Sequence, residues 1–173
     1  MNGRESLLAA ASELFASDGF DATTTRGIAE RAGVDATLIA RYFGSKTGLY
    51  LATLRAELGD AAPPALLDPA RMAFLLGRVD DRGPGPVFQA AVRGHDDDAV
   101  QAAAREVLHT RLVEPLRAAY DGDERAQLRA ELAVAAFAGI ALGRAGGAFG
   151  ELAKVDLAEL VELVTELLGP QVQ

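Results

Sequence analysis

The side chains best suited to catalysis or metal binding are few and widely separated. The chain of 173 residues has no cysteine and two histidines, His95 and His109. His95 lies beside three aspartates at 96–98, which could form a weak metal cluster. Three acidic residues before a helical pattern more simply open a helix, because the positive end of the helix dipole favours negative charge. His109 could hydrogen-bond a ligand, or it could be an ordinary core or surface side chain.

A glycine-rich stretch, GRAGGAFG at 143–150, superficially resembles a phosphate-binding loop. No strand pattern precedes it and no Gly-Lys-Ser/Thr follows it, so we interpret it as a helix end and a turn. No convincing catalytic constellation is found. The sequence therefore predicts a protein that is not an enzyme, with no metal site and no cofactor.

Side chains suited to nucleic-acid binding gather in residues 24–46. The whole chain has a net charge of −8, which argues mildly against such a role. Most of the acidity lies elsewhere, because residues 1–58 carry a net charge of −1 and residues 59–173 carry −7. Residues 24–46 contain four cations and two carboxylates. A small basic face of this kind suffices if a dimer presents two copies of it.

Two short helical patterns joined by a tight turn must position these side chains. The first runs from Thr25 to Ala32 and the second from about Ala36 to Phe43. Between them, Gly33 can end a helix in the left-handed conformation, and the Asp35 carboxylate can accept from the amides that open the next helix. This is the pattern of a helix-turn-helix unit, although an αα corner in a helical core has similar spacing.

The exact string is more informative than the pattern. T-T-x-x-I-A-x-x-A-G-V, a Tyr-Phe pair and S-K-x-x-L, over roughly residues 7–58, resemble the N-terminal domain of the TetR family of bacterial transcriptional regulators. The matching residues are Thr24, Thr25, Ile28, Ala29, Ala32, Gly33, Val34, Tyr42, Phe43, Ser45, Lys46 and Leu49. The resemblance implies an all-α regulator that binds DNA through the second helix of this unit.

Each candidate DNA contact has a physical rationale. Thr24 is the expected cap of the first helix, and the resemblance adds a phosphate contact there. Arg26 could pair with guanine or phosphate, or remain solvated. Thr37 could contact a thymine methyl group or donate to a base, whereas Arg41 would meet phosphate. Ser45 should cap the next helix, and its amides and the Lys46 ammonium would then form a phosphate clamp. The predicted DNA-binding set is Thr24, Thr25, Arg26, Ala36, Thr37, Arg41, Tyr42 and Lys46.

Two residues depart from the family pattern. Ala40 stands where the family usually has a tyrosine, which removes one expected backbone contact. Asp35 replaces the more usual serine and adds a negative charge near the DNA. These departures bear on affinity and sequence preference rather than on the fold.

The rest of the chain also follows helical periods. Helices are expected over 5–17 and 45–58, and then over 68–79, 87–92, 97–120, 124–145 and 156–168, giving about nine in total. Gly59-Asp60-Ala61-Ala62-Pro63-Pro64 is the clearest boundary, so we predict a DNA-binding domain at 1–58 and a ligand-binding and dimerisation domain at 59–173. Pro115 predicts a kink near Arg111 or Leu112.

Gly139 and Gly143 place two small residues one helical turn apart, which permits close approach of another helix within the chain or between subunits. The resemblance favours a homodimer formed by the last two long helices. The predicted interface is Gly139, Gly143, Leu160, Val161, Val164 and Leu168. The middle helices would enclose a small, mainly apolar effector. Candidate lining residues, each of which could also be plain core, are Met72, Phe74, Leu75, Phe88, Val92, Leu108, His109 and Leu112.

We therefore expect a ligand-responsive transcriptional regulator that binds a palindromic operator as a homodimer, with repression favoured by the resemblance. The alternative is a helical scaffold whose helix-turn-helix no longer recognises DNA. Residues 1–8 lack a long apolar core, and the most apolar run, 132–143, is too short to span a bilayer, so a cytoplasmic location without membrane contact is expected.

Overall fold

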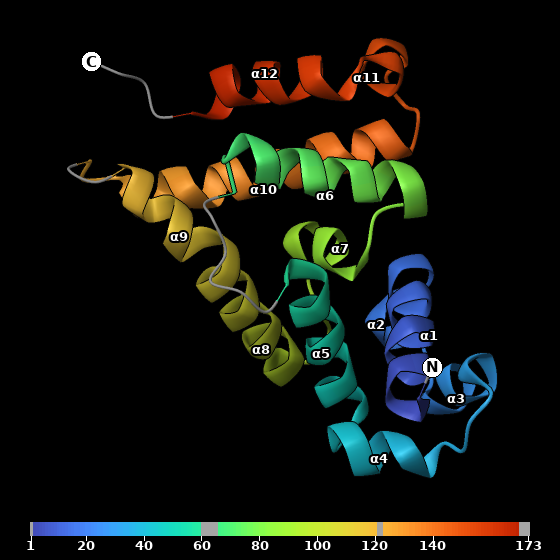
Figure 1. The fold of residues 1–173 in the computed structure, drawn as a ribbon. Coiled ribbons are helices and arrows are strands. Elements are labelled where there is room, and N and C mark those ends of the chain that lie inside the picture. The colour runs from blue at the N-terminus through green and yellow to red at the C-terminus, as the bar shows by residue number, and fades with distance from the viewer. Residues whose placement is uncertain (1, 60–65, 121–122, 170–173) are drawn as a thin grey trace. The chain divides into compact units, whose positions relative to one another are not determined.

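The computed structural model describes residues 2–59, 66–120 and 123–169, and these residues contain helices and no strand (Figure 1). The all-α fold class is thus confirmed. Most of the predicted boundary at 59–64 lies outside the described residues. Spatial contacts divide the chain into two units, which we call the N-terminal unit (1–60 with 85–107) and the C-terminal unit (61–84 with 108–173).

The N-terminal unit contains the helices expected before residue 58, and two later ones. Its elements are α1 (Gly3–Ser17), α2 (Gly19–Ala22), α3 (Thr25–Ala32), α4 (Thr37–Phe43), α5 (Lys46–Leu58), α7 (Pro86–Val92) and α8 (Asp98–Leu108), the last of these up to Val107. The short helix α2 was not predicted. The spatial division places α7 and α8 with the first five helices. The predicted boundary between a DNA-binding and a ligand-binding domain at residues 58–59 therefore remains a prediction.

The core of the N-terminal unit is built around α1, which packs against α3, α4, α5 and α7. Fully buried apolar side chains from these helices fill it, among them Leu7, Phe15, Ile28, Leu49 and Leu54. Burying such side chains stabilises the unit by about 1.5–3 kcal/mol each. These contacts fix α3 and α4 on a rigid support.

A buried carboxylate joins α5 to α7. Glu57 is only 5% exposed, and its Oε2 accepts a hydrogen bond of 3.0 Å from the Val87 amide in the first turn of α7. A negative charge at a helix N-terminus is stabilised by the helix dipole. Gly85 leaves the space for this carboxylate, because a Cβ atom there would collide with it.

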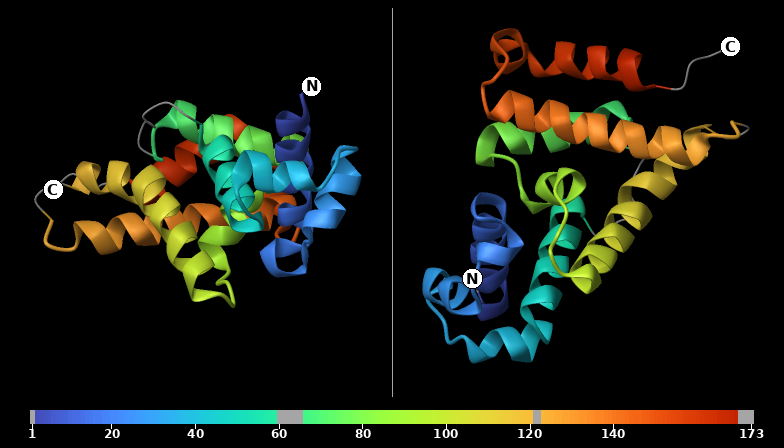
Figure 2. Two further views of the ribbon diagram at one scale, coloured as in Figure 1. Left: turned by 90° about the horizontal axis from the view of Figure 1, so that it is seen from below. Right: turned by 180° about the vertical axis from the view of Figure 1, so that it is seen from behind.

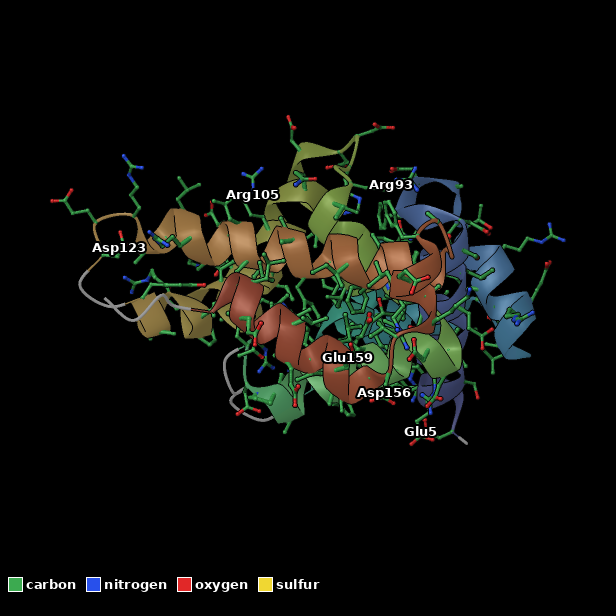
Figure 3. All side chains as sticks on the ribbon, turned by 90° about the horizontal axis from the view of Figure 1, so that it is seen from above. Glu5, Arg93, Arg105, Asp123, Asp156 and Glu159 are labelled. Atoms are coloured by element: carbon green, nitrogen blue, oxygen red, sulfur yellow. The ribbon has the colours of Figure 1, made fainter. Side chains whose placement is uncertain are left out.

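The C-terminal unit contains α6 (Pro69–Arg82), the π-helical turn η1 (His109–Val113), α9 (Glu114–Arg117), η2 (Ala118–Tyr120), α10 (Ala126–Ala145), α11 (Gly150–Lys154) and α12 (Leu157–Leu168). α6 packs against both α10 and α12, and α10 also packs against α9 and η1 (Figures 1 and 2). Asp156 caps α12 by accepting from the Ala158 amide at 2.8 Å, and Figure 3 labels Asp156 and Glu159 in this region.

Arg144 fastens the turn after α10. Its side chain is 10% exposed and pairs with Asp80 of α6 through two hydrogen bonds of 2.8 and 2.9 Å. The same guanidinium donates to the carbonyls of Leu152 and Val155, each at 2.9 Å. The glycine-rich stretch at 143–150 therefore lies at a helix end and a turn, as interpreted from the sequence.

The predicted long helix over 97–120 is interrupted where Pro115 predicted a distortion. Residues His109–Val113 form a π turn, in which the Glu114 amide donates to the His109 carbonyl five residues earlier. Proline has no amide hydrogen to give to the carbonyl four residues before it, so the hydrogen-bond register shifts around this point.

Helix α10 is longer than the apolar run at 132–143 that the sequence analysis considered. Among the described residues it is the one helix long and apolar enough to cross a membrane by length and composition, with 33% of its apolar window buried. This finding concerns the whole helix, whereas the uncharged run at 132–143 within it is the short one that the sequence analysis described. The partial burial of α10 leaves an apolar face whose role is considered below.

Candidate nucleic-acid interface

The N-terminus of α3 carries three of the predicted contacts, and all three side chains are exposed. Thr24 caps the helix, because its hydroxyl oxygen accepts from the Gly27 amide at 3.0 Å, as predicted. Thr25 follows as the first helical residue. The Arg26 guanidinium pairs with Glu30 at 2.8 Å, and both side chains are largely exposed. Solvent screens an exposed pair of this kind, so it does not prevent Arg26 from binding an anion.

The turn between α3 and α4 forms as the sequence predicted. Gly33 adopts the left-handed conformation (φ 67°) and ends α3, with its amide donating to the carbonyls of Ala29 and Glu30. The Asp35 carboxylate accepts from the Thr37 amide at 2.7 Å and also from the Thr37 hydroxyl. Both hydrogen bonds lower the pKa of the Asp35 carboxyl, and the bond from the Thr37 hydroxyl has the larger effect.

The Asp35 contact changes what Thr37 can offer to DNA. Its hydroxyl hydrogen is given to the carboxylate, so in this arrangement Thr37 presents a methyl group and an acceptor oxygen. A thymine methyl contact therefore fits the geometry better than donation to a base.

The outer face of α4 is open. Ala36, Thr37, Ala40, Arg41 and Tyr42 are all exposed, whereas Ile39 is buried in the unit core. The Arg41 guanidinium lies over the Tyr42 ring at 5.8 Å from its centroid. Arg41 makes no ion pair with any described residue, so its positive charge is not neutralised within this part of the chain.

Sequence reasoning missed Arg4, which the fold brings to the end of α4. Its guanidinium lies over the Phe43 ring, 5.3 Å from the centroid, and Phe43 in turn meets the Tyr42 ring edge-on at 6.4 Å. Two arginines thus flank an aromatic pair, in the order Arg41, Tyr42, Phe43, Arg4. No local signal in the sequence pairs Arg4 with a residue almost forty positions later.

The N-terminus of α5 is capped by Ser45, whose hydroxyl accepts from the Gly48 amide at 2.9 Å, as predicted. The half-buried Lys46 side chain is engaged within the unit. Its Nζ donates to the carbonyls of Phe20 and Thr23 at 2.8 and 2.9 Å and lies 4.1 Å from the centroid of the Phe20 ring. Lys46 therefore closes the end of α2, and one ammonium hydrogen remains for an outside partner.

The residues predicted to line an effector site divide between the two units. Phe88 and Val92 belong to the N-terminal unit, and the other six belong to the C-terminal unit. Met72, Leu75, Phe88 and Leu112 are buried, Leu108 and His109 are half-buried, and Phe74 and Val92 are exposed. The His109 Nε2 atom lies 3.2 Å from the Gln127 side-chain amide on α10.

The residues predicted for a subunit interface also differ in exposure. Leu160, Val161 and Val164 are buried within the C-terminal unit, and Leu168 is half-buried. The Phe149 ring lies over Gly143, whereas a Cβ atom on Gly139 would meet nothing within 4 Å. The exposed apolar side chains of these helices are instead Leu128 and Leu132 on α10 and Leu163 and Leu167 on α12.

Comparison with known proteins agrees with this arrangement. Residues 7–53 match the sequence profile of bacterial regulatory proteins of the tetR family. Residues 69–171, more than half of the chain, match the profile of the tetracyclin repressor-like C-terminal domain. A search of curated proteins found no match.

Solved structures resemble the whole chain. The fatty acid degradation regulator FadR from Bacillus halodurans is 16% identical, with a TM-score of 0.65 over 98% of this chain and 99% of its own. A TetR transcriptional regulator from Rhodococcus sp. RHA1 is 20% identical, with a TM-score of 0.61 over 99% and 97%. FadR from Bacillus subtilis, solved with stearoyl-CoA, is 19% identical, with a TM-score of 0.59 over 98% and 99%. These likenesses support the fold, and the profile matches confirm the resemblance found in the sequence: the chain belongs to the tetR family of bacterial regulatory proteins, which bind DNA and regulate transcription.

Proposed function

We propose that the protein is a repressor that binds a palindromic operator as a homodimer and is released from it by a small, mainly apolar effector. The observation that carries the DNA-binding part is the open face of α4, where Thr37, Arg41 and Tyr42 are exposed above a rigid core. A helix presented in this way enters the major groove, with its N-terminal residues at the base edges. Neither a metal, a cofactor nor an enzymatic reaction forms part of the proposal.

The proposed contacts divide by chemistry. Ala36 and Thr37, at the start of α4, would meet base edges, with the Thr37 methyl group against thymine. Thr24, Thr25 and Arg26 at the start of α3 would hold a phosphate, together with the amides of the helix N-terminus. Arg41 and Tyr42 would meet phosphates at the groove rim, and Lys46 would offer its remaining ammonium hydrogen. Arg4 joins this set because its charge is held beside Phe43.

DNA binding is tested by fluorescence anisotropy with DNA from upstream of the gene and a scrambled duplex, at several salt concentrations. Specific binding about a thousandfold tighter than to the scramble is expected. Arg41→Ala should weaken binding to every sequence and reduce the salt slope by about one, whereas Arg55→Ala, on the exposed side of α5, should do neither. Equal, weak binding to duplexes from across the genome would favour the alternative, a helical scaffold protein without DNA recognition.

The dimer proposal rests on a face of α10 that the protomer leaves uncovered. Leu128, Leu132, Ala135 and Gly139 recur at helical spacing, and all are exposed. Small residues beside leucines allow close helix approach, so a second copy can pack its own α10 against this face. In the right-hand view of Figure 2, no other helix of the C-terminal unit lies in front of α10 or α12. Leu163 and Leu167 of α12 extend the apolar surface.

Oligomeric state distinguishes this proposal from a monomer. Leu132→Glu would place a charge in the middle of the interface, and sedimentation should then report a monomer that retains its helical content. Ala102→Glu, on an exposed position of α8, is the matched control and should sediment as the wild type does. A wild-type monomer at micromolar concentration would refute the interface and, with it, recognition of a two-fold operator.

The effector site is proposed around η1 in the C-terminal unit. Single π turns inside helices are frequent at functional sites, and this one presents His109 next to the buried Leu112. Met72 and Leu75 of α6 add buried apolar surface. A protein of this fold solved with stearoyl-CoA is consistent with a mainly apolar ligand. Coupling to DNA release should be worth ~1–3 kcal/mol, and equal ligand affinity with and without operator would refute it.

We also propose a cytoplasmic location, where operator DNA is accessible.

A further inference from the structure

The N-terminal unit contains a cleft of about 260 Å³, distinct from the faces considered so far. It is lined by residues of α1, α2, α5 and α7 and of the connection from α7 to α8. Its volume lies just below the range of about 300–1,000 Å³ found for sites that take drug-sized ligands, so it suits a smaller molecule.

An aromatic cluster forms the apolar side of this cleft. The rings of Phe15, Phe20 and Tyr50 meet at centroid distances of 5.0–5.9 Å, and all three side chains are at least nine-tenths buried. Such mutually packed rings cannot easily rearrange, and they present only their edges to the cleft, chiefly that of Phe20, which is 9% exposed.

Three charged side chains stand around the aromatic side. Asp18 and Asp21 lie at the start of α2 and within it, and Arg93 lies on the connection between α7 and α8, where Figure 3 labels it. None of the three makes an ion pair or a side-chain hydrogen bond with another described residue. One cleft therefore presents exposed charges of both signs that do not pair with one another.

A polar part of the cleft wall is held by hydrogen bonds. The Tyr50 hydroxyl and the His95 Nε2 atom are 3.1 Å apart, and the His95 amide donates to the Gln101 side chain at 2.8 Å. The His95 ring also meets the Phe20 ring edge-on at 5.6 Å. Burial, with the nearby charges of Glu57 and Asp21, raises the pKa of Tyr50 well above its ordinary range. The hydroxyl thus stays protonated at neutral pH.

We propose that this cleft binds a small zwitterion that carries an aromatic ring, of the class represented by an aromatic α-amino acid. The ring would pack against the exposed edge of Phe20, the ammonium would meet Asp18 and Asp21, and the carboxylate would meet Arg93. A simple cation would leave the Arg93 charge unmatched, and a simple anion would leave the two carboxylates unmatched. The proposal does not depend on DNA binding or on the effector site of the C-terminal unit.

Three probes of equal ring size separate the charges: phenylalanine, phenethylamine with only the ammonium, and 3-phenylpropionate with only the carboxylate. Each is titrated into the full-length ¹⁵N-labelled protein, and the amide signals of Gly19 and Gly94, which line the cleft, are followed. Phenylalanine should bind at least about tenfold more tightly than either half-probe, because a charge-assisted contact is worth a factor of ten or more. Phenylalanine that causes no saturable shift, or half-probes that bind equally well, would overturn the proposal.

Charge variants test the assignment of each contact. Asp21→Asn and Arg93→Gln should each weaken phenylalanine binding about tenfold. Asp96→Asn and Arg105→Gln make the same changes at exposed residues that do not line the cleft, and they should leave binding unchanged. Circular dichroism of all four variants checks the fold. Equal losses in the cleft variants and their controls would refute the site, whatever the outcome of the DNA experiments.

Discussion

The Lys46 side chain offers the sharpest test of how the N-terminal unit is held together. Its ammonium donates to the Phe20 and Thr23 carbonyls, which α2 leaves without helical partners at its end. It also lies against the Phe20 ring, 4.1 Å from the centroid. Lys46→Met keeps the aliphatic stem and removes the charge, so it deletes both hydrogen bonds and the cation–π contact at once.

The expected loss of unfolding free energy is about 2 kcal/mol. Each charge-assisted hydrogen bond contributes roughly 1.5–3 kcal/mol and the ring contact about 0.5–1 kcal/mol. Lys46 is only half-buried, so water can replace part of what the carbonyls lose, and the sum is reduced accordingly. For a chain of this length, such a loss lowers the melting temperature by roughly 4–8 °C.

Thermal unfolding followed by circular dichroism measures this shift, with Lys154→Met as the control. Lys154 is the other lysine of the chain, lies exposed on α11 and forms no ion pair with a described residue, so its loss should change the melting temperature little. Lys46→Met should also weaken DNA binding, because α2 and α5 position the helix-turn-helix. Weaker DNA binding at an unchanged melting temperature would show that Lys46 acts on phosphate alone and would refute a structural role.

Further substitutions test the turn, the cap and the C-terminal unit. Gly48→Ala places a Cβ atom against the backbone carbonyl that ends α4 and should cost roughly 2 kcal/mol or more in urea unfolding; wild-type stability would contradict this close approach. Thr37→Val removes the hydroxyl that lowers the pKa of Asp35, so an NMR titration should find that pKa closer to its ordinary value. The stability that this depressed pKa confers is present above the unfolded-state pKa of Asp35 and lost as the pH falls through the folded-state value, so Thr37→Val should lose less stability between neutral and acidic pH. Arg144→Met removes the bidentate pair with the exposed Asp80 carboxylate and two hydrogen bonds to backbone carbonyls, and it should lower the unfolding free energy by about 2 kcal/mol, which an unchanged urea midpoint would exclude.

Signals that act over three or four residues were predictable from the sequence. Thr24 and Ser45 cap their helices, Gly33 ends α3 in the left-handed conformation, and Pro115 is preceded by the π turn. In each case the residue and the group it satisfies lie within one turn of the same chain segment. The residue type therefore suffices to predict the local structure at these positions.

Contacts between distant segments were not predictable in the same way. The position of Lys46 at the start of a helix predicted a phosphate contact, yet its side chain donates to the carbonyls of residues 20 and 23. Arg4 similarly meets a ring that only the packing of α1 on α4 brings near. A sequence pattern specifies which face of a helix is apolar, but the tertiary arrangement decides which long polar side chains can reach across to it.

The last helix illustrates the same limit. Leu160, Val161 and Val164 were assigned to a subunit interface because they share an apolar face, and α6 covers that face within the protomer. Leu163 and Leu167 form a second apolar face that remains exposed. A helix that is apolar on two sides has two partners, and periodicity alone does not say which of them belongs to the same chain.

The exposed apolar face of α10 could be covered by a membrane or by a second subunit. The charged residues of the helix favour a second subunit. Between Glu131 and Arg144 the uncharged stretch rises only about 18 Å, which is well short of the ~30 Å hydrocarbon core of a bilayer. Arg144 is moreover committed to Asp80 and to two backbone carbonyls inside the unit. What remains exposed is one stripe that includes Leu132 and Gly139 rather than a full apolar circumference, and a stripe is what a partner helix covers.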